Sequence, residues 1–369
     1  MKISLYKTLN IMITNWHPTN LPHTIDLETK AILKKLTGAH RALAELKGIA
    51  QSIPQQEILI NTLALQEAKD SSEIENIVTT HDELYKSSLE VGEAISAQSK
   101  EVQNYIAALK KGFAIVKKTE LLTVNSILEI QEVLEQNNAG LRKQPGTSLK
   151  NQKTGEIVYE PPQHAEVIKN LMTNLEIYIN DQQQSDIDPI IKMAVIHFQF
   201  ESIHPFYDGN GRTGRIINIL YLVLNGLLDL PILYLSRYII KHKNDYYRLL
   251  QEVREIENWE EWILFMIDSV EQVAKNTITL IVSIKELMQK VKVQLRDNYK
   301  FYSQELLNHL FKQPYTKIEF LMTDLSISRV TASSYLNQLA EDGLLIKHKL
   351  GKSNYYINTQ LMNLLFAMD

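Results

Sequence analysis

The chain has 369 residues, of which 44% are hydrophobic, and this is enough for two or three compact units with their own cores. It contains no cysteine, which excludes disulfides, zinc–thiolate sites and cysteine nucleophiles and favours a reducing compartment. The net charge of −4 gives no general attraction to nucleic acid or anionic lipid. We expect a cytoplasmic protein, because Met1 to Trp16 lacks a signal-peptide pattern and the apolar stretch Ile216 to Leu235 is too interrupted to span a bilayer.

Few glycines and prolines and long amphipathic stretches predict a mainly α fold. An extended arm is expected from Trp16 to Pro22, where two prolines occur. Helices follow over about residues 25–49 and 54–70, separated by Ser52-Ile53-Pro54. Further helical patterns cover residues 91–117, 122–136 and 164–180.

Residues 149–159 are the one region in the first two thirds that reads as strands. They alternate in polarity around a Lys-Thr-Gly turn and are stopped by Pro161-Pro162. We therefore expect a small β-hairpin here. By itself such a hairpin is as compatible with a surface loop as with a functional one.

The segment His-Pro-Phe-Tyr-Asp-Gly-Asn-Gly-Arg-Thr-Gly-Arg, residues 204–215, is the most informative part of the chain. His204 ends a helix that begins at Asp188-Pro189. The apolar run of residues 216–224 predicts a buried helix after the segment, stopped by Asn225-Gly226. The glycines on either side of Asn210 thus open a helix N-terminus, where unpaired N–H groups favour anions.

Two arginines complete this segment. Arg212 and Arg215 are three residues apart, so both are expected to point from one helix face towards the same phosphates. A Gly-Asn-Gly turn between helices is often only a turn, and His-Pro often only ends a helix. The joint occurrence of base, carboxylate, glycines and arginines instead favours a site that moves a phosphate-containing group.

These residues match the signature His-x-Phe-x-Asp/Glu-Gly-Asn-Gly-Arg-x-x-Arg at every defined position, so the chain resembles Fic-domain proteins. The resemblance implies a mainly α Fic core with a β-hairpin flap. It also implies a nucleotidyltransferase that moves AMP from ATP to a Ser, Thr or Tyr hydroxyl of a target protein, and of itself, and releases pyrophosphate.

The resemblance also implies a role for each position. His204 is the expected general base, because a neutral imidazole can take the proton of the attacking hydroxyl. Asp208 is the expected Mg²⁺ ligand, since that cation needs few protein carboxylates once phosphate oxygens are present. Phe206 is expected to anchor the loop. The expected ATP-binding segment comprises Gly209, Asn210, Gly211, Arg212, Thr213, Gly214 and Arg215.

Within that segment the glycines and Asn210 supply donors to the α-phosphate, Arg212 holds the triphosphate and Arg215 pairs with the γ-phosphate. Thr213 and Gly214 fall at variable positions of the signature, and we assign them no chemical role. Tyr246 or Tyr247 is expected near the adenine, although paired tyrosines usually pack a core.

The flap is expected at Ile157, Val158 and Tyr159, where strand-like hydrogen bonds would hold the target segment.

Ser71-x-x-x-Glu75-Asn76 resembles the inhibitory helix that Fic proteins carry before their core. Alone, the pattern is equally typical of the start of an ordinary helix with acidic residues in its first turn. The resemblance implies that Glu75 pairs with Arg215, removes the partner of the γ-phosphate and so inhibits the enzyme. Glu73 is the competing carboxylate, but its distance from Ser71 is wrong.

The last third of the chain predicts a different unit. Trp259 and Trp262 are expected in the core, and a long amphipathic helix runs from Val273 to Leu295 and ends near Asp297-Asn298. Two helical segments, a Ser-capped third helix and a hairpin around residues 350–352 then predict a winged helix-turn-helix. The predicted domains are residues 1–90, helical with the inhibitory motif; 91–270, the Fic core; 271–298, a connecting helix; and 299–369, the winged helix.

Three other readings stay open. Related enzymes move phosphoryl or phosphocholine groups, although they usually depart from Gly-Asn-Gly-Arg, and an enzyme of this kind can also remove AMP from a modified protein. A DNA-binding regulator is the third, but residues 300–369 carry seven basic and six acidic side chains, whereas DNA-binding modules show a clear basic footprint. The target protein, the signal that releases Glu75 and the oligomeric state, a homodimer included, are not fixed by the sequence.

Overall fold

The structure is a computed structural model that describes residues 16–53, 56–80, 83–84, 96–151, 154–181, 186–350 and 353–366. It is mainly helical with two small antiparallel sheets, which confirms the predicted fold class. None of the helices in these ranges combines the length and apolarity that crossing a bilayer requires.

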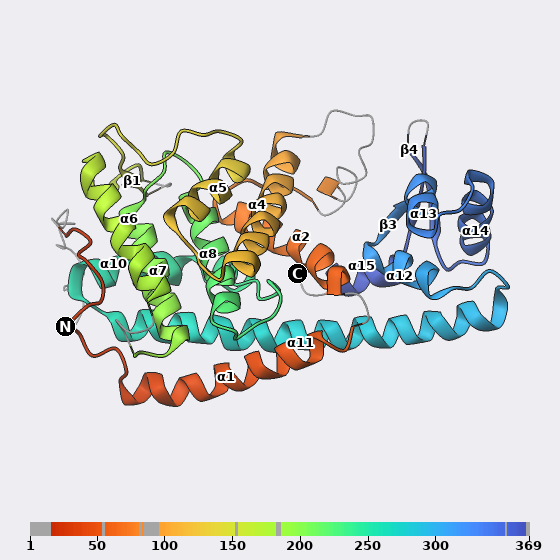
Figure 1. The fold of residues 1–369 in the computed structure, drawn as a ribbon, viewed down its shortest axis with the longest axis horizontal. Coiled ribbons are helices and arrows are strands. Elements are labelled where there is room, and N and C mark those ends of the chain that lie inside the picture. Colours follow the sequence, from red (N-terminus) through yellow and green to blue (C-terminus); the bar gives the residue numbers. More distant parts are fainter. Residues whose placement is uncertain are drawn as a thin grey trace, which may run out of the picture.

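Two long helices form the base of the molecule (Figure 1). Helix α1, Lys30–Ala50, packs along α11, Trp259–Asn298. Helix α1 begins at residue 30 and not near 25, because the Thr29 hydroxyl accepts a hydrogen bond from Ile32 N and caps it there. Helix α11 is continuous over 40 residues, so the expected boundary between residues 270 and 271 falls inside one helix. The predicted bounds of the domains stay predictions.

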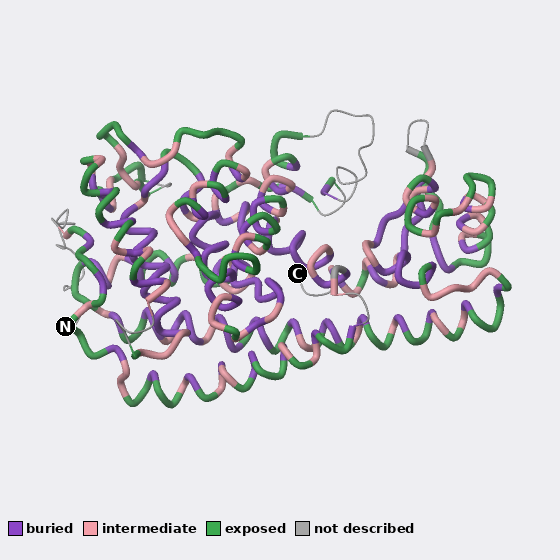
Figure 2. The backbone as a smooth tube through the Cα atoms, viewed as in Figure 1, coloured by how far each residue is buried: buried purple, intermediate pink, exposed green. Residues whose placement is uncertain are grey.

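The central pair of helices is α7, Pro189–Ile203, and α8, Asn210–Leu224. Helix α7 is buried along almost its whole length, which Figure 2 shows as a purple interior, because other helices cover it on all sides. Trp259 and Trp262 are buried as predicted, and Trp262 Nε1 donates to the Ala194 carbonyl at 3.0 Å. The surrounding helices are α2 (Gln56–Ile74), α4 (Ala97–Thr119), α5 (Val124–Glu135), α6 (Ala165–Asn180), α9 (Ser236–Lys241) and α10 (Lys243–Ile256).

The predicted hairpin is present. Strands β1, Leu149–Lys150, and β2, Ile157–Tyr159, pair antiparallel, with Leu149 opposite Tyr159. Residues 152–153 of its turn lie outside the described residues. Tyr159 anchors the hairpin to the core: its ring is buried, its hydroxyl donates to the Ser202 carbonyl at 2.8 Å, and the Arg254 guanidinium lies 4.1 Å from its centroid.

The C-terminal module contains the predicted helices, the Ser-capped third helix and the hairpin, together with a strand, β3, and a last helix, α15, that were not predicted. Its sheet has the strand order β3-β5-β4, and the Ser328 hydroxyl caps α14 by accepting from Thr331 N at 3.2 Å. The module touches the core at α2, where the Gln66 amide donates to the Leu365 carbonyl. Its elements are α12 (Gln304–Lys312), β3 (Tyr315–Lys317), α13 (Ile318–Leu325), α14 (Arg329–Glu341), β4 (Ile346–Leu350), β5 (Ser353–Ile357) and α15 (Thr359–Phe366).

Candidate active site

The loop between α7 and α8 is fixed by its own side chains. His204 ends α7 in the left-handed conformation, with φ 48°, and its N–H bonds the Phe200 carbonyl at 2.9 Å. Asn210 closes the loop, because its side-chain oxygen accepts from Phe206 N and its amide donates to Phe206 O, both at 2.8 Å. The Phe206 ring is fully buried near Phe200, as predicted for an anchor. The Asn210 side chain therefore serves the loop, and only its backbone remains for an anion.

His204 is held in its neutral form. Burial, together with the positive charges of Arg142 and Arg254, lowers its pKa to about 4. Its Nδ1 is buried and has no hydrogen-bond partner among the described residues. The imidazole at neutral pH is thus uncharged and able to accept a proton.

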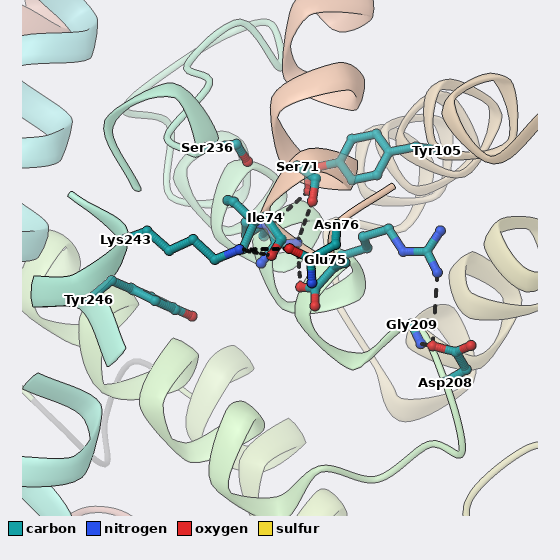
Figure 3. Close-up of polar contacts among 12 residues, drawn as sticks. Ser71, Ile74, Glu75, Asn76, Tyr105, Asp208, Gly209, Ser236, Lys243 and Tyr246 are labelled. Atoms are coloured by element: carbon teal, nitrogen blue, oxygen red, sulfur yellow. Dashed lines mark hydrogen bonds and ion pairs between the residues drawn. The ribbon is translucent and has the colours of Figure 1, made fainter. Parts of the chain in front are cut away.

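Arg215 is buried and bound to the segment that the sequence predicted. Its Nε donates to Ser71 Oγ at 2.7 Å, and its Nη2 donates to Ser71 O and to Glu75 Oε1, both at 2.8 Å. The polar contacts of this segment are drawn in Figure 3. Helix α2 continues through Ile74 and does not stop near residue 70, so Ser71 lies in its last turn and Glu75 directly after it. The motif is therefore the end of a helix and not the start of one.

The turn after α2 is itself held in place. Asn76 has a left-handed backbone, with φ 63°, which reverses the chain after Glu75. Lys243 Nζ donates to the Ile74 carbonyl at 2.6 Å and approaches Asn76 Oδ1 at 3.4 Å (Figure 3). No feature of the local sequence pointed to Lys243, because the contact joins residues 169 positions apart.

Arg212 contacts different carboxylates from the one that Arg215 contacts. It forms ion pairs with Glu101 of α4 and, at 2.9 Å, with Glu135 of α5, and lies 3.9 Å from Asp208. In this structure the two arginines thus contact different carboxylates, and the expectation that both bind the same phosphates stays a prediction. Glu101 and Glu135 were not predicted, since neither belongs to a local motif.

Two carboxylates cover the glycines of the turn. The Glu135 carboxylate stands where a Cβ on Gly209 would be, and the Glu75 carboxylate stands where a Cβ on Gly211 would be. Gly209 also has a φ of 78°, which a residue with a side chain rarely adopts. Burial raises the pKa of Glu135 to about 7. Acidic side chains of the protein itself thus lie against both glycines and leave no room for a Cβ at either position.

Asp208 is the exposed carboxylate of the loop. Its side chain is 80% exposed, and its Oδ1 accepts from Gly209 N at 2.7 Å. Among the described residues there is no group of three or more His, Asp or Glu side chains that could enclose a metal ion. One open carboxylate fits a Mg²⁺ ion that takes its remaining ligands from phosphate and water.

The remaining residues of the predicted ATP-binding set differ in their exposure to solvent. Tyr246 is 2% exposed and its hydroxyl bonds His197 Nε2 at 2.8 Å, whereas Tyr247 is 43% exposed, so only Tyr247 offers an open ring. Thr213 is fully buried, and Gly214 packs closely against Glu201, so both lie in the interior between α8 and α7.

In the hairpin, Ile157 and Val158 are half-buried and Tyr159 is buried.

Three family models match separate parts of the chain. Residues 33–114 match the Fic/DOC family N-terminal model, residues 121–222 match the Fic/DOC family model, and residues 284–361 match the C-terminal domain described as protein adenylyltransferase SoFic-like. Together they extend over most of the described chain.

Curated relatives and solved structures agree with these matches. A probable protein adenylyltransferase of Aquifex aeolicus is 30% identical over 188 residues, 50% of this chain and 55% of its own length. Protein adenylyltransferase fic-1 of Caenorhabditis elegans is 24% identical over 140 residues, 37% of this chain and 28% of its own. The chain thus spans about half of the first relative and about a quarter of the second.

A Fic family protein from Desulfovibrio desulfuricans has the same fold, with a TM-score of 0.58 at 20% identity over 92% of this chain and 98% of that one. Residues 134–508 of Fic-1 from Caenorhabditis elegans give a TM-score of 0.53 at 19% identity, over 67% and 71% of the two chains. With the signature loop, the three model matches and this fold, the chain belongs to the Fic/DOC family.

Proposed function

We propose that the chain is a protein adenylyltransferase, which moves AMP from ATP to Ser, Thr or Tyr hydroxyls of target proteins and of itself. The relatives named protein adenylyltransferase support this reaction class. The observation that carries the proposal is the placement of an uncharged His204 at the end of α7, one short loop before a helix N-terminus with two arginines. A chain without cysteine suits a reducing compartment, which supports a cytoplasmic location.

The reaction is an in-line displacement at the α-phosphorus of ATP. The target hydroxyl oxygen forms a bond to this phosphorus, the bond to the oxygen that bridges to the β-phosphorus breaks, and pyrophosphate leaves with the electron pair. The proton of the hydroxyl passes to the His204 imidazole. Backbone N–H groups at the start of α8 stabilise the negative charge that develops on the α-phosphate oxygens.

Asp208 would hold Mg²⁺, which neutralises phosphate charge when it is bound. The side chain is suited to this because it is exposed and because one of its oxygens is already oriented by Gly209 N. Tyr247, the exposed member of the tyrosine pair, is the residue that we propose to lie against the adenine. The hairpin around Ile157 and Val158 would pair with an extended target segment.

Glu75 would inhibit this activity in the resting chain. Its carboxylate takes the Nη2 donor of Arg215 and fills the space over Gly211, so a phosphate at the same place would meet both an occupied partner and a like charge. ATP would then bind in a pose that does not align the α-phosphorus with the incoming hydroxyl. Moving Glu75 aside frees Arg215 for the γ-phosphate.

The test uses ATP labelled at either end. Wild-type protein and its Glu75→Gly variant are incubated with a cell lysate and Mg²⁺, and labelled proteins are identified by mass spectrometry. We expect label from the α-phosphate and none from the γ-phosphate, with an added mass equal to AMP. Transfer of the γ-label would identify a phosphotransferase instead, and no label from either end would remove the proposal.

A further inference from the structure

Arg142 ties the catalytic loop to the hairpin, although it belongs to neither. It lies between α5 and β1 and is 1% exposed. Its Nε donates to the His204 carbonyl at 2.7 Å, and its Nη2 donates to the Pro162 carbonyl at 2.9 Å. Nη2 also approaches the Ile203 carbonyl at 3.4 Å. One guanidinium therefore bonds both the end of α7 and Pro162, three positions after the end of β2.

The backbone of residues 142–144 also bonds the loop between α7 and α8. Arg142 N donates to the Pro205 carbonyl at 2.8 Å, and the N–H groups of Lys143 and Gln144 both point at the Tyr207 hydroxyl, at 3.0 and 3.3 Å. The carbonyls at the end of a helix lack partners within the helix, so they need donors from elsewhere. A planar guanidinium can serve two such carbonyls in fixed directions, whereas an ammonium group serves as a point charge.

We propose that Arg142 is a positioning residue for AMP transfer, which holds the backbone of His204 and the segment that follows the target-binding hairpin in one fixed geometry. The base and the hydroxyl that it deprotonates come from two different segments. Arg142 bonds the His204 carbonyl and the chain that follows the hairpin, in addition to the bond between Tyr159 of the hairpin and the Ser202 carbonyl. This inference rests on the proposed function, because the hairpin acts on a target only if the chain modifies proteins.

The charge of Arg142 has a second effect on the base. Burial is the first cause of the low pKa of His204, and the nearby positive charges of Arg142 and Arg254 lower the pKa further. Glu75 and the Glu201 backbone carbonyl act in the opposite direction and raise it. Removing the charge at residue 142 should therefore raise the pKa of His204, while a lysine in its place should not.

Three variants of the full chain separate charge from geometry, each made in the Glu75→Gly background. Arg142→Lys keeps the charge and loses the planar fork, Arg142→Gln loses the charge, and Lys143→Gln removes one charge from the neighbouring exposed residue. We measure the rate of self-modification against pH and the KM for ATP. The His204 titration is followed by NMR on ¹³C-histidine protein, with the signal assigned by its loss in a His204→Gln variant.

We expect Arg142→Lys to lower kcat about 10- to 100-fold with an unchanged KM for ATP. The reason is that a lysine no longer holds the two segments in a fixed relative position. The acid limb of its pH profile should stay in place. Arg142→Gln should lower kcat similarly and also move the His204 titration up by about 1 pH unit. Lys143→Gln should leave both the rate and the titration unchanged.

A wild-type kcat in Arg142→Lys would overturn the positioning role, as would equal losses in Lys143→Gln. A folded Arg142→Gln in which His204 titrates as in the parent would overturn the electrostatic part. The buried His197, which should remain uncharged in every variant, reports an intact core. Absence of transfer in the Glu75→Gly parent would instead remove the proposed function, and the NMR titration would still decide the effect of the Arg142 charge.

Discussion

Arg215 and Glu75 are 140 residues apart in sequence and form an ion pair of 2.8 Å. The two partners are unequal, because the Arg215 side chain is 1% exposed whereas that of Glu75 is 33% exposed. A buried guanidinium needs a counter-charge or several hydrogen-bond acceptors. Here the hydroxyl and the carbonyl of Ser71 are two such acceptors. The partly exposed carboxylate is the partner that can leave, and under the proposed function the γ-phosphate of ATP replaces it.

We expect Glu75→Gly to raise adenylylation, including self-modification, on the order of 10²-fold above the wild type. Without the carboxylate, Arg215 is free for the γ-phosphate, so the α-phosphorus can settle in line with the hydroxyl. The gain should require Mg²⁺, because under the proposed function Asp208 acts only through the metal. The measurement is incorporation of label from the α-phosphate of ATP.

Two further variants test the reason for this gain. Glu75→Gly combined with Arg215→Ala should show no activation, since the freed guanidinium is what the gain depends on. Glu73→Gly is the matched control: its carboxylate approaches Lys69 at 3.5 Å instead of Arg215, so it should leave activity at the wild-type level. Equal activation by Glu73→Gly would mean that any damage to the end of α2 loosens the site.

His204→Ala should abolish transfer and leave ATP binding largely intact. The imidazole moves a proton and contributes little to holding the nucleotide, so the loss should appear in kcat, by ~10²–10⁴-fold. Calorimetric ATP binding and label incorporation, both in the Glu75→Gly background, measure the two effects separately. Transfer at the parent rate would contradict the assignment of His204 as the base.

Glu67→Gln should gain stability relative to the wild type as pH rises from 5 to 7.5. Glu67 is buried, and burial raises its pKa to about 7 although Ser236 and Tyr105 donate to it. Because the unfolded pKa is near 4.5, the folded wild type holds one extra proton between these values and loses stability as pH rises through this window. The difference should reach up to ~3 kcal/mol, measured by denaturant unfolding at both pH values. A pH-independent difference would contradict an uncharged Glu67.

The full chain should bind duplex DNA no more tightly than about micromolar at physiological salt, without sequence preference. On the C-terminal module, Arg329 is paired with Glu319 at 2.6 Å and Lys347 donates to Asn337 at 2.7 Å. These cations are thus partly engaged within the module. Fluorescence anisotropy at several salt concentrations measures the affinity, and Glu319→Gln, which frees Arg329, should tighten it modestly. Nanomolar, sequence-selective binding would restore the regulator interpretation.

Local patterns predicted the parts of the site that are close in sequence. The loop of residues 204–215, its Phe206 anchor and the hairpin before Pro161-Pro162 each depend on signals within about ten residues, and all are present. The contact between Glu75 and Arg215 is long-range and was available only because the resemblance to Fic proteins supplied it. The inhibitory effect of that contact stays a prediction.

Residues without a motif could not be found in this way. The contacts of Glu101, Glu135 and Arg142 with the loop join residues that are 62 to 111 positions apart in sequence. None of the three residues belongs to a local sequence motif. The burial of Tyr246 beside the exposed Tyr247 is likewise a product of packing, since the two side chains are equivalent in sequence. Sequence pattern thus identified the loop but not the groups that surround it.

The two carboxylates over Gly209 and Gly211 also bear on how fast the nucleotide can bind. If phosphates occupy this turn in the productive pose, Glu75 and Glu135 must move before the productive complex forms, and the formation of that complex is then limited by this motion and not by diffusion. The observed rate of binding should therefore level off as the ATP concentration rises. In Glu75→Gly one of the two obstacles is gone, so the plateau should lie higher and the lag before the first turnover should be shorter.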